Sequence, residues 1–326
     1  MIITRTPFRV SYLGGGTDIP WFFENYGGGA VISAAIDKYM FLSAHPMFAS
    51  DKILLKYSTT ELAESARDLN HPIAREILTD EGLSGIDISV SADIPAGTGL
   101  GSSSAFTVGL THLARAYKGN YISKMDLASQ ACHIELDLLK EPIGKQDQFA
   151  SAFGGLNLYE FLPSGEVLVK PLQLDTESLT WLRNCMVLVR TGVTSRSASE
   201  ILRKQGEESK STEDIANSLQ GLRTLALDAF SELQADVRAI GPMVASSWEL
   251  KKRSSPFVSN SGIDQLIDFG ISNGAMGSKL LGAGQGGFVL FIVEPDKKKD
   301  FISLFKENTA ISVDIDYAGS TVVYYQ

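Results

Sequence analysis

The sequence predicts an α+β protein built from two domains. Its 326 residues exceed the length at which a single hydrophobic core usually stops growing. Strand patterns dominate the first hundred residues, helical patterns follow them, and both kinds recur in the second half of the chain. A hairpin turn is predicted near the midpoint, over 161–166. We therefore expect an N-terminal domain over residues 1–165 and a C-terminal domain over residues 166–326.

The first half of the chain predicts strands followed by helices. Alternation of apolar and polar residues predicts strands over 2–12, 31–44, 53–57 and 86–93. Apolar residues at helical spacing predict helices over 103–117 and 124–139. The pair Gly154-Gly155 marks a turn into one further strand, which leads to the hairpin.

The second half mixes the same two kinds of element. Apolar runs predict strands over 186–190, 288–293 and 321–325. Helical patterns cover 197–205, 216–237, 263–267 and 298–308. The three lysines at 297–299 are interpreted as the solvent-facing start of the last of these helices.

Charge and composition argue against several classes of function. The formal net charge of −9 at pH 7 is unfavourable for general binding of nucleic acid or of acidic membranes. No run of about 18 apolar residues predicts a membrane span, and the N-terminus lacks the apolar core of a signal peptide. Cys132 and Cys185 lie far apart without metal-ligand spacing, which is typical of buried thiols in a reducing compartment. We expect a cytoplasmic protein with no nucleic-acid or membrane partner, and its oligomeric state stays open.

A glycine-rich segment between a predicted strand and a predicted helix is typical of a phosphate-binding loop. It has the sequence Ile-Pro-Ala-Gly-Thr-Gly-Leu-Gly-Ser-Ser-Ser-Ala over 94–105. Glycine lets the backbone approach a ligand closely, and the helix start offers unpaired N–H groups and the positive end of its dipole. The residues expected to bind the phosphates of a nucleotide are Pro95, Gly97, Thr98, Gly99, Leu100, Gly101, Ser102, Ser103 and Ser104.

This segment matches neither of the two common nucleotide-binding motifs. The dinucleotide fingerprint requires G-x-G-x-x-G, whereas this chain has G-x-G-x-G. The P-loop requires Gly-Lys followed by Ser or Thr, and neither tripeptide occurs in the chain. A plain strand-to-helix connection is the alternative that involves no ligand. If phosphate binds here, a third kind of loop binds it.

Two further glycine-rich segments lie near the ends of the chain. Near the N-terminus, Arg9 lies in a strand that ends in Gly-Gly-Gly-Thr-Asp over 14–18. Near the C-terminus, Gly-Ala-Gly-Gln-Gly-Gly over 282–287 precedes a strand. A turn explains the glycines of the first segment, but it does not explain Arg9 and Asp18, which are suitable ligands for a polar molecule.

Taken in this order, the three segments resemble the motifs of the GHMP kinases, the superfamily of galactokinase, homoserine kinase, mevalonate kinase and phosphomevalonate kinase. The loop over 95–105 is similar to the family motif P-x-x-x-G-L-G-S-S-A almost residue for residue. The resemblance implies the two-domain GHMP kinase fold, in which the N-terminal domain is like the second domain of ribosomal protein S5 and the C-terminal domain is ferredoxin-like. It also implies an ATP-dependent kinase that phosphorylates a small-molecule hydroxyl in the cleft between the domains.

The resemblance also implies roles for single residues. Glu135 and Asp147 lie twelve residues apart, as in the galactokinase stretch that carries a metal-side glutamate and a catalytic aspartate. Carried over, Asp147 accepts the proton of the attacking hydroxyl or orients that hydroxyl, and Arg9 holds the aspartate ionised and stabilises developing charge. Glu135 and the Ser103 hydroxyl would bind Mg²⁺ beside ATP. Each residue also has an alternative, purely structural interpretation. Glu135 would then lie on a solvated helix face, Asp147 would cap a helix, and Arg9 would lie on the surface of a strand.

The acceptor site can be expected at the first segment. Its implied residues are Gly15, Gly16, Thr17, Asp18, Gln146 and Gly284. Galactokinases have Glu and His where this chain has two of its glycines, so two side chains are removed and room is gained. This segment, with Gly-Lys-Gln-Asp-Gln over 144–148 and Thr-Gly-Val-Thr-Ser-Arg-Ser-Ala over 191–198, resembles the heptose 7-phosphate kinase branch. Arg196 and Lys279 are expected partners for the phosphate already present on such a sugar, and placement in solvent is the alternative for both.

The function expected from these residues is ATP- and Mg²⁺-dependent phosphorylation of a sugar or sugar phosphate. The favoured reaction is transfer to the anomeric C1 hydroxyl of D-glycero-D-manno-heptose 7-phosphate, for the synthesis of nucleotide-activated heptose. Two alternatives stay open: a fucokinase- or galactokinase-like enzyme that acts on an unphosphorylated sugar, and a non-catalytic sensor of sugar and ATP on the same fold.

Overall fold

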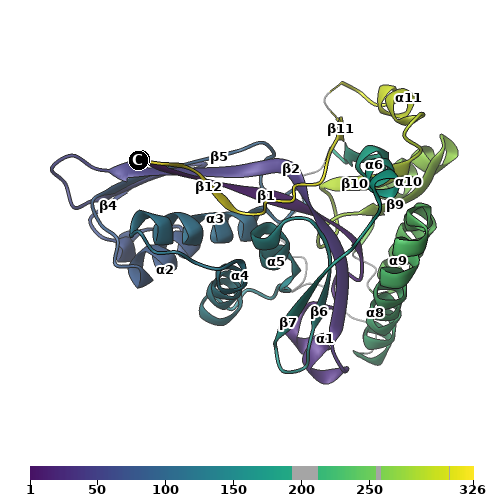
Figure 1. The fold of residues 1–326 in the computed structure, drawn as a ribbon, viewed down its shortest axis with the longest axis horizontal. Helices are drawn as coiled ribbons and strands as arrows, with labels where there is room; N and C mark the ends of the chain where they lie inside the picture. The colour runs from purple at the N-terminus through teal and green to yellow at the C-terminus, as the bar shows by residue number, and fades with distance from the viewer. Residues whose placement is uncertain (193–211, 255–257, 308) are drawn as a thin grey trace.

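The computed structural model describes residues 1–192, 212–254, 258–307 and 309–326, which form two sheets with helices packed against them (Figure 1). Within these residues the larger sheet has eight strands: β1 (Ile2–Leu13), β2 (Gly29–Pro46), β3 (Ile53–Lys56), β4 (Thr60–Ala63), β5 (Ile86–Ala92), β6 (Leu156–Phe161), β7 (Val167–Pro171) and β12 (Thr321–Tyr325). The strand order is β12-β1-β2-β5-β3-β4, and β6 pairs with both β2 and β7. The pair β3–β5 is parallel, and the other pairs of this sheet are antiparallel.

Strand β1 carries the first glycine-rich segment to the centre of the molecule. It pairs with β2 from Ile2 opposite Ala44 to Leu13 opposite Ile32, and two irregularities shift the register on the way. Its second half is buried throughout, and the helices in contact with β1 are α3 (Ser102–Tyr117), α5 (Gln146–Phe153), α8 (Thr212–Ala235) and α9 (Ile240–Ser254). Each fully buried aromatic or aliphatic side chain of this kind contributes about 1.5–3 kcal/mol to folding.

Helices cover one face of the larger sheet. Figure 1 shows α2 (Pro72–Asp80), α3 (Ser102–Tyr117), α4 (Lys124–Cys132) and α5 (Gln146–Phe153) together on that face. A π-helical stretch, η2 (His133–Leu138), continues α4. The short helices α1 (Pro20–Asn25) and η1 (Ala66–Asp68) complete this part. The side of α3 that faces the sheet is apolar, and the hydroxyl of Thr4 in β1 donates a hydrogen bond of 3.1 Å to the carbonyl of Gly109.

The smaller sheet comes from the second half of the chain. In the part of the chain that the structure describes it has four antiparallel strands, β8 (Met186–Arg190), β9 (Ala275–Leu280), β10 (Phe288–Val293) and β11 (Ala310–Ser312), in the order β11-β8-β10-β9. The helices around it are α6 (Thr176–Cys185), α8 (Thr212–Ala235), η3 (Val237–Ala239), α9 (Ile240–Ser254), α10 (Ser261–Ser272) and α11 (Lys298–Ser303). Helix α9 packs against β9, α8 packs against α9 and β2, and Figure 1 shows both helices along the outside of the molecule.

One apolar core joins the two sheets. Buried residues of β1 and β2 share a continuous cluster with buried residues of β8 and β10. At the junction the Tyr12 hydroxyl donates to the sulfur of Met186 over 2.7 Å, and burial raises the pKa of Tyr12 well above its usual value. The N-terminal strand therefore packs directly against the C-terminal half of the chain.

Most of the predicted elements are confirmed, and a few differ. The predicted helix over 298–308 was too long, because α11 ends at Ser303. Several elements had no prediction, since short or evenly apolar stretches give weak periodicity; they include the helices α1, α2, α5, α6 and α9 and the strands β4, β9 and β11. The predicted helix over 197–205 lies outside the described residues. The boundary at residue 165 stays a prediction; beyond it, β7 pairs with β6 and β12 pairs with β1 in the larger sheet.

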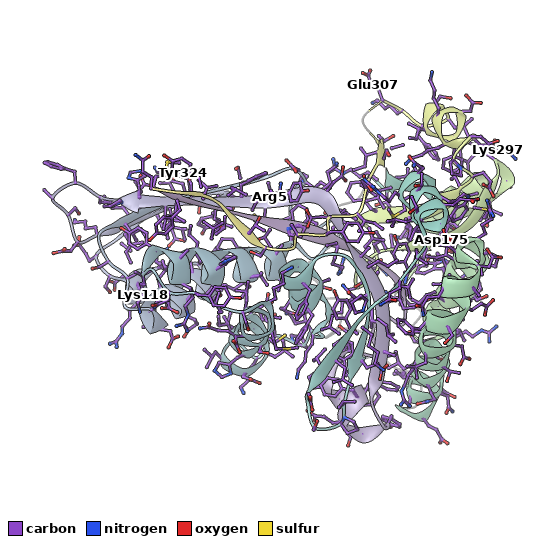
Figure 2. All side chains as sticks on the ribbon, in the orientation of Figure 1. Arg5, Lys118, Asp175, Lys297, Glu307 and Tyr324 are labelled. Atoms are coloured by element: carbon purple, nitrogen blue, oxygen red, sulfur yellow. The ribbon has the colours of Figure 1, made fainter. Side chains whose placement is uncertain are left out.

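Charged side chains lie mainly on the outside of the molecule. Figure 2 shows Lys118, Lys297 and Glu307 at its periphery, and each of them is exposed. The exposure of Lys297, just before α11, fits the interpretation of the lysine run as a solvated helix start. Cys132 and Cys185 are buried free thiols, as expected. Across the described ranges, no helix has both the length and the apolar character needed to traverse a bilayer.

Candidate active site

The loop over 95–101 has the geometry of an anion cradle. Gly97, Gly99 and Gly101 all have positive φ angles, of 74°, 78° and 78°, which glycine adopts without strain. The loop leads into α3, so the unpaired N–H groups of its first turn, at Ser102 to Ser104, point toward the loop. The Thr98 hydroxyl donates to the carbonyl of Pro95 over 3.0 Å and fixes the turn.

The third glycine-rich segment packs directly on this loop. A Cβ added to Gly99 would lie 2.5 Å from the carbonyl oxygen of Leu281, and one added to Gly282 would lie 2.6 Å from the Cα of Gly99. The amide of Phe288 donates to the carbonyl of Thr98 over 3.1 Å. The two loops therefore touch backbone to backbone, and the buried Gly284 lies in the second of them.

Arg9 and Asp147 form a bidentate ion pair next to the loop. Nε and Nη2 of Arg9 each donate over 2.7 Å to the two carboxylate oxygens of Asp147. Nη1 of Arg9 donates over 2.6 Å to the carbonyl of Gly99, and the Arg9 amide donates over 3.2 Å to the carbonyl of Leu100. The Arg9 side chain is 4% exposed and that of Asp147 is 22% exposed. Asp147 is thus held rigidly at the glycine loop and still faces solvent.

Glu135 lies beneath Ser103 at the start of α3. Its carboxylate accepts from the Ser103 hydroxyl over 2.8 Å and from Nε2 of Gln148 over 2.6 Å, and the side chain is fully buried. Burial raises the pKa of Glu135, whereas the hydrogen bonds from Ser103, Gln148 and Ser104 act in the opposite direction. Glu135 belongs to the π-helical stretch η2, and such stretches occur frequently at functional sites. It is not on a solvated helix face.

Asp18 is held by backbone amides of two segments. One carboxylate oxygen accepts from the amide of Gly16 over 3.0 Å, and the other accepts from the amide of Gln146 over 3.1 Å. The amide of Lys145 also donates to the Asp18 carbonyl over 3.2 Å. Burial raises the pKa of Asp18, and the nearby charge of Asp147 raises it further. The first segment and the start of α5 therefore bring two carboxylates to one place.

Two buried polar atoms beside Asp18 have no hydrogen-bond partner among the described residues. They are Oε1 of Gln146 and the hydroxyl of Ser11, which lies 3.2 Å from the position of a Cβ added to Gly15. A polar ligand would satisfy such atoms. Gly16 lies next to Leu219 of α8. The Thr17 hydroxyl, by contrast, is already bonded to the carbonyls of Gly14 and Ala30.

Arg196 and Lys279 are the two residues expected to bind a phosphate on the substrate. Arg196 lies outside the described residues. Lys279 lies in β9 and is 2% exposed, so it is not in solvent, and its ammonium donates over 3.0 Å to the carbonyl of Tyr12. Burial lowers the pKa of Lys279 well below its usual value, and the charges of Lys251 and Arg9 act in the same direction.

Lys251 lies at this site without having been predicted. It occupies the last turn of α9, and its ammonium donates over 2.6 Å to the carbonyl of Gly282. Burial lowers its pKa to about 8, with Arg9 acting in the same direction and Asp18 and Asp147 opposing it. The sequence offers no signal for this position, because a Lys-Lys-Arg run at a helix end is typical of a solvated helix C-terminus.

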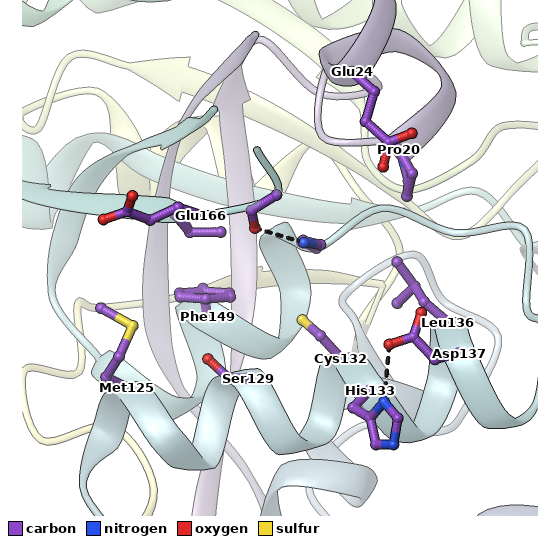
Figure 3. A pocket seen from close by; sticks show the side chains of 13 residues that line it. Pro20, Glu24, Met125, Ser129, Cys132, His133, Leu136, Asp137, Phe149 and Glu166 are labelled. Atoms are coloured by element: carbon purple, nitrogen blue, oxygen red, sulfur yellow. Dashed lines mark hydrogen bonds and ion pairs between the residues drawn. The ribbon is translucent and has the colours of Figure 1, made fainter. Parts of the chain in front are cut away.

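A separate cavity of about 500 Å³ opens beside this site (Figure 3). It is lined by α1, α4, η2, α5 and the turn between β6 and β7, and none of its lining residues belongs to the three glycine-rich segments. Glu24, Asp137 and His133 lie around it, and the side chain of Asp137 is largely exposed and hydrogen-bonded to His133. The chemistry-bearing groups instead gather where the three segments meet.

The chain is similar to known proteins along most of its length. The family model of the GHMP kinases N terminal domain matches residues 56–155, and that of the GHMP kinases C terminal matches residues 226–307. D-glycero-alpha-D-manno-heptose 7-phosphate kinase from Campylobacter jejuni is 30% identical over 98% of this chain and 98% of its own length. Galactokinase from Pyrococcus furiosus is 27% identical over 91% of this chain and 90% of its own length.

The fold is shared with solved structures as well. A crystal structure of a D-glycero-D-manno-heptose 1-phosphate kinase from Bacteroides thetaiotaomicron covers 100% of both chains with a TM-score of 0.79 at 24% identity. The expected two-domain architecture is thereby confirmed. The chain therefore belongs to the GHMP kinases, and it is an ATP-dependent sugar kinase of that family.

Proposed function

We propose that this kinase transfers the γ-phosphoryl group of ATP to the C1 hydroxyl of D-glycero-D-manno-heptose 7-phosphate, and that the product serves the synthesis of nucleotide-activated heptose. The observation that carries the proposal is the Arg9–Asp147 pair, which is held between the glycine loop and Asp18. The Campylobacter jejuni relative, which aligns along almost the whole chain, supports this choice of sugar.

Asp147 is the proposed partner of the attacking hydroxyl. Its carboxylate is partly exposed, whereas both of its neighbours Arg9 and Asp18 are buried, so it is the carboxylate that a hydroxyl can reach. It accepts the proton of the hydroxyl or orients the hydroxyl toward the phosphorus. Arg9 keeps the carboxylate in place and, through its third contact at Gly99, joins it to the phosphate loop.

The loop and the start of α3 are the proposed triphosphate site. Backbone N–H groups and the dipole of α3 favour the negative charge of phosphates, so the segment from Pro95 to Ser104 contributes mainly through its main chain. This contribution needs no cationic side chain within the loop, in keeping with its sequence of glycines and hydroxyl residues.

Mg²⁺ is proposed at Ser103 and Glu135. Their oxygens are in contact, and one hydroxyl plus one carboxylate is the kind of donor set that Mg²⁺ uses when phosphates complete its shell. Among the residues that the structure covers, no group of three or more His, Cys, Asp and Glu could hold a metal ion alone. The ion would therefore take its other ligands from ATP and water, and it would neutralise phosphate charge.

The acceptor is proposed to lie over Asp18, Gly15, Gly16 and Gln146. The carboxylate of Asp18 offers lone pairs to sugar hydroxyls, and the unpartnered Oε1 of Gln146 lies beside it. The absence of side chains at the two glycines leaves room for a seven-carbon sugar. Thr17 follows them in the same segment, and its main chain is proposed to border the sugar. Gly284 is proposed to close the site from the third segment.

A coupled assay of ATP turnover tests the proposal. Heptose 7-phosphate should be turned over far better than heptose, mannose, fucose or galactose, and phosphorus NMR should place the new phosphate on C1. Strong turnover of an unphosphorylated sugar alone would overturn the choice of substrate, and binding of sugar and ATP without turnover would favour a sensor.

Asp147→Asn tests the role of the aspartate in the same assay. It should lower kcat by about 100- to 10,000-fold, the usual contribution of a positioned acid or base, while ATP binding is retained. Asp137→Asn is the matched control, because Asp137 is an exposed carboxylate in a neighbouring helix. Near-normal turnover by Asp147→Asn would contradict the assignment.

A further inference from the structure

Lys251 lies at the point where the two glycine-rich loops meet. Its ammonium bonds the carbonyl of Gly282, whose backbone packs against Gly99. The carbonyl of Gly99 in turn accepts from Arg9, and Arg9 holds Asp147. A continuous chain of contacts therefore connects Lys251 to Asp147.

Nothing in the described residues neutralises the charge of Lys251 directly. Its ammonium has three donors, and the single acceptor found for them among these residues is the Gly282 carbonyl. The two nearby carboxylates are already bonded elsewhere: Asp147 takes the bidentate pair with Arg9, and Asp18 takes two backbone amides. No ion pair within 4.0 Å joins Lys251 to either of them across the described ranges.

Lys251 belongs to a group of three cations and two carboxylates at this site. Arg9 and Lys279 lie close enough to repel it, and among the described residues Asp18 and Asp147 oppose them. An ammonium that has lost part of its hydration gains most from an additional anion. Every reaction of a sugar kinase involves anions of one chemical kind, namely phosphate oxygens.

We propose that Lys251 is a phosphate-binding residue of the cleft, which contacts a phosphate oxygen of a reactant at the meeting point of the two loops. The phosphate has two possible sources: the phosphate already carried by the sugar, and the phosphoryl group in transfer from ATP. The first source rests on the proposed function, whereas the second requires only that the chain is a sugar kinase.

Steady-state kinetics of Lys251→Met test this role, with Lys252→Met as the matched control. Methionine keeps the apolar stem and removes the charge, whereas Lys252 is the next residue of the same helix and pairs with Glu249 over 2.8 Å. A charge-assisted hydrogen bond to phosphate predicts a loss of about 10- to 100-fold in kcat/KM. Lys251→Gln is measured alongside, in case the methionine variant does not fold.

The distribution of the loss identifies the source of the phosphate. A higher KM for the sugar phosphate with unchanged kcat identifies the sugar's own phosphate, and a lower kcat with unchanged KM values identifies the transferring group. Kinetic constants within twofold of the wild type, or an equal loss in Lys252→Met, would overturn the proposal. If the wild-type enzyme turns over only an unphosphorylated sugar, the proposed substrate fails, and the same variants measured with that sugar still decide the role of Lys251.

The pH profile gives a readout that a purely structural role would not change. An ammonium with a pKa of about 8 loses its proton as the pH rises through 8, so a rate that depends on it should fall there. The charged groups that face it are Arg9, Asp18, Asp147 and Lys279. Lys251→Met should lack this fall, and an identical alkaline limb in wild type and variant would overturn the proposal.

Discussion

Gly101→Ala is expected to disturb catalysis through a single added methyl group. Gly101 is the N-cap of α3, and a Cβ at this position would lie 3.1 Å from Oδ2 of Asp147 and 3.4 Å from Cγ of Arg9. An ordinary contact begins at about 3.4 Å, so the carboxylate must move by about 0.3 Å. If a displacement of 1 Å costs about 100-fold in rate, 0.3 Å corresponds to a loss of about fourfold in kcat.

The same helix provides a matched control. Gly119 follows the C-terminus of α3 with a φ of 73°, close to the 78° of Gly101, and a Cβ added there meets nothing within 4 Å. Alanine at either position is forced into the left-handed region at a cost of about 1–2 kcal/mol. Both variants should therefore melt a few degrees lower, by similar amounts, because the strain is the same.

Coupled kinetics and thermal unfolding of both variants separate the two effects. Gly101→Ala should lose several-fold in kcat at saturating ATP and sugar, and Gly119→Ala should keep the wild-type kcat. The reasoning is refuted if Gly101→Ala has normal kcat, or if Gly119→Ala loses as much, since strain in the helix ends would then explain the result without contact to Asp147.

Further outcomes follow from the other groups of the site. Glu135→Gln should raise the Mg²⁺ concentration that gives half-maximal activity, since the proposed ligand loses its charge, whereas Asp137→Asn should not; equal Mg²⁺ requirements in both would count against the metal site. Gly144→Ala should raise the KM for the sugar, because its Cβ would lie 1.8 Å from Oδ2 of Asp18 and must displace that carboxylate; an unchanged KM would argue against Asp18 as a sugar ligand. Lys279→Met should raise the melting temperature, by an amount that shrinks as the pH rises toward 10.5. Because the pKa of Lys279 is lowered in the fold, the folded chain binds fewer protons than the unfolded chain, and the wild-type protein becomes more stable as the pH rises. A gain in melting temperature that does not depend on pH would contradict this sign.

The glycine loop and its environment could be predicted because their signals are local. Neighbouring residues alone predict the glycine turn, the serines that follow it and the strand and helix on either side. The structure has glycines with positive φ in this turn and α3 starting at Ser102. Arg9 is more informative, because a surface strand position was the alternative. Its burial at 4% exposure follows from Asp147, which lies 138 positions away and is brought close only by the packing of α5 on β1.

The positions that could not be predicted depend on contacts distant in sequence. Lys251 looks like any cation at a helix end, and its placement depends on α9 lying against β9 so that its last turn reaches Gly282. The π-helical turn around Glu135 has no pattern of its own, since one extra residue in a turn is invisible to apolar spacing. In both cases the contacts of the side chain could not be predicted, because they come from elements that are distant in the sequence or from an irregular helical turn.

Buried carboxylates explain why this site needs its ligands. Burial raises the pKa of Glu135 and of Asp18, which means that their charged forms are destabilised in the fold. A core selected for stability alone would not keep two such groups next to a third carboxylate at Asp147. Metal, nucleotide and sugar would offset this penalty by giving each carboxylate a cation or hydroxyl partner. Burial likewise destabilises the charged form of Lys251, whose pKa is lowered to about 8, and a phosphate oxygen would stabilise its ammonium. Both the buried carboxylates and the buried ammonium are thus destabilised by their surroundings, and the proposed ligands would offset both penalties.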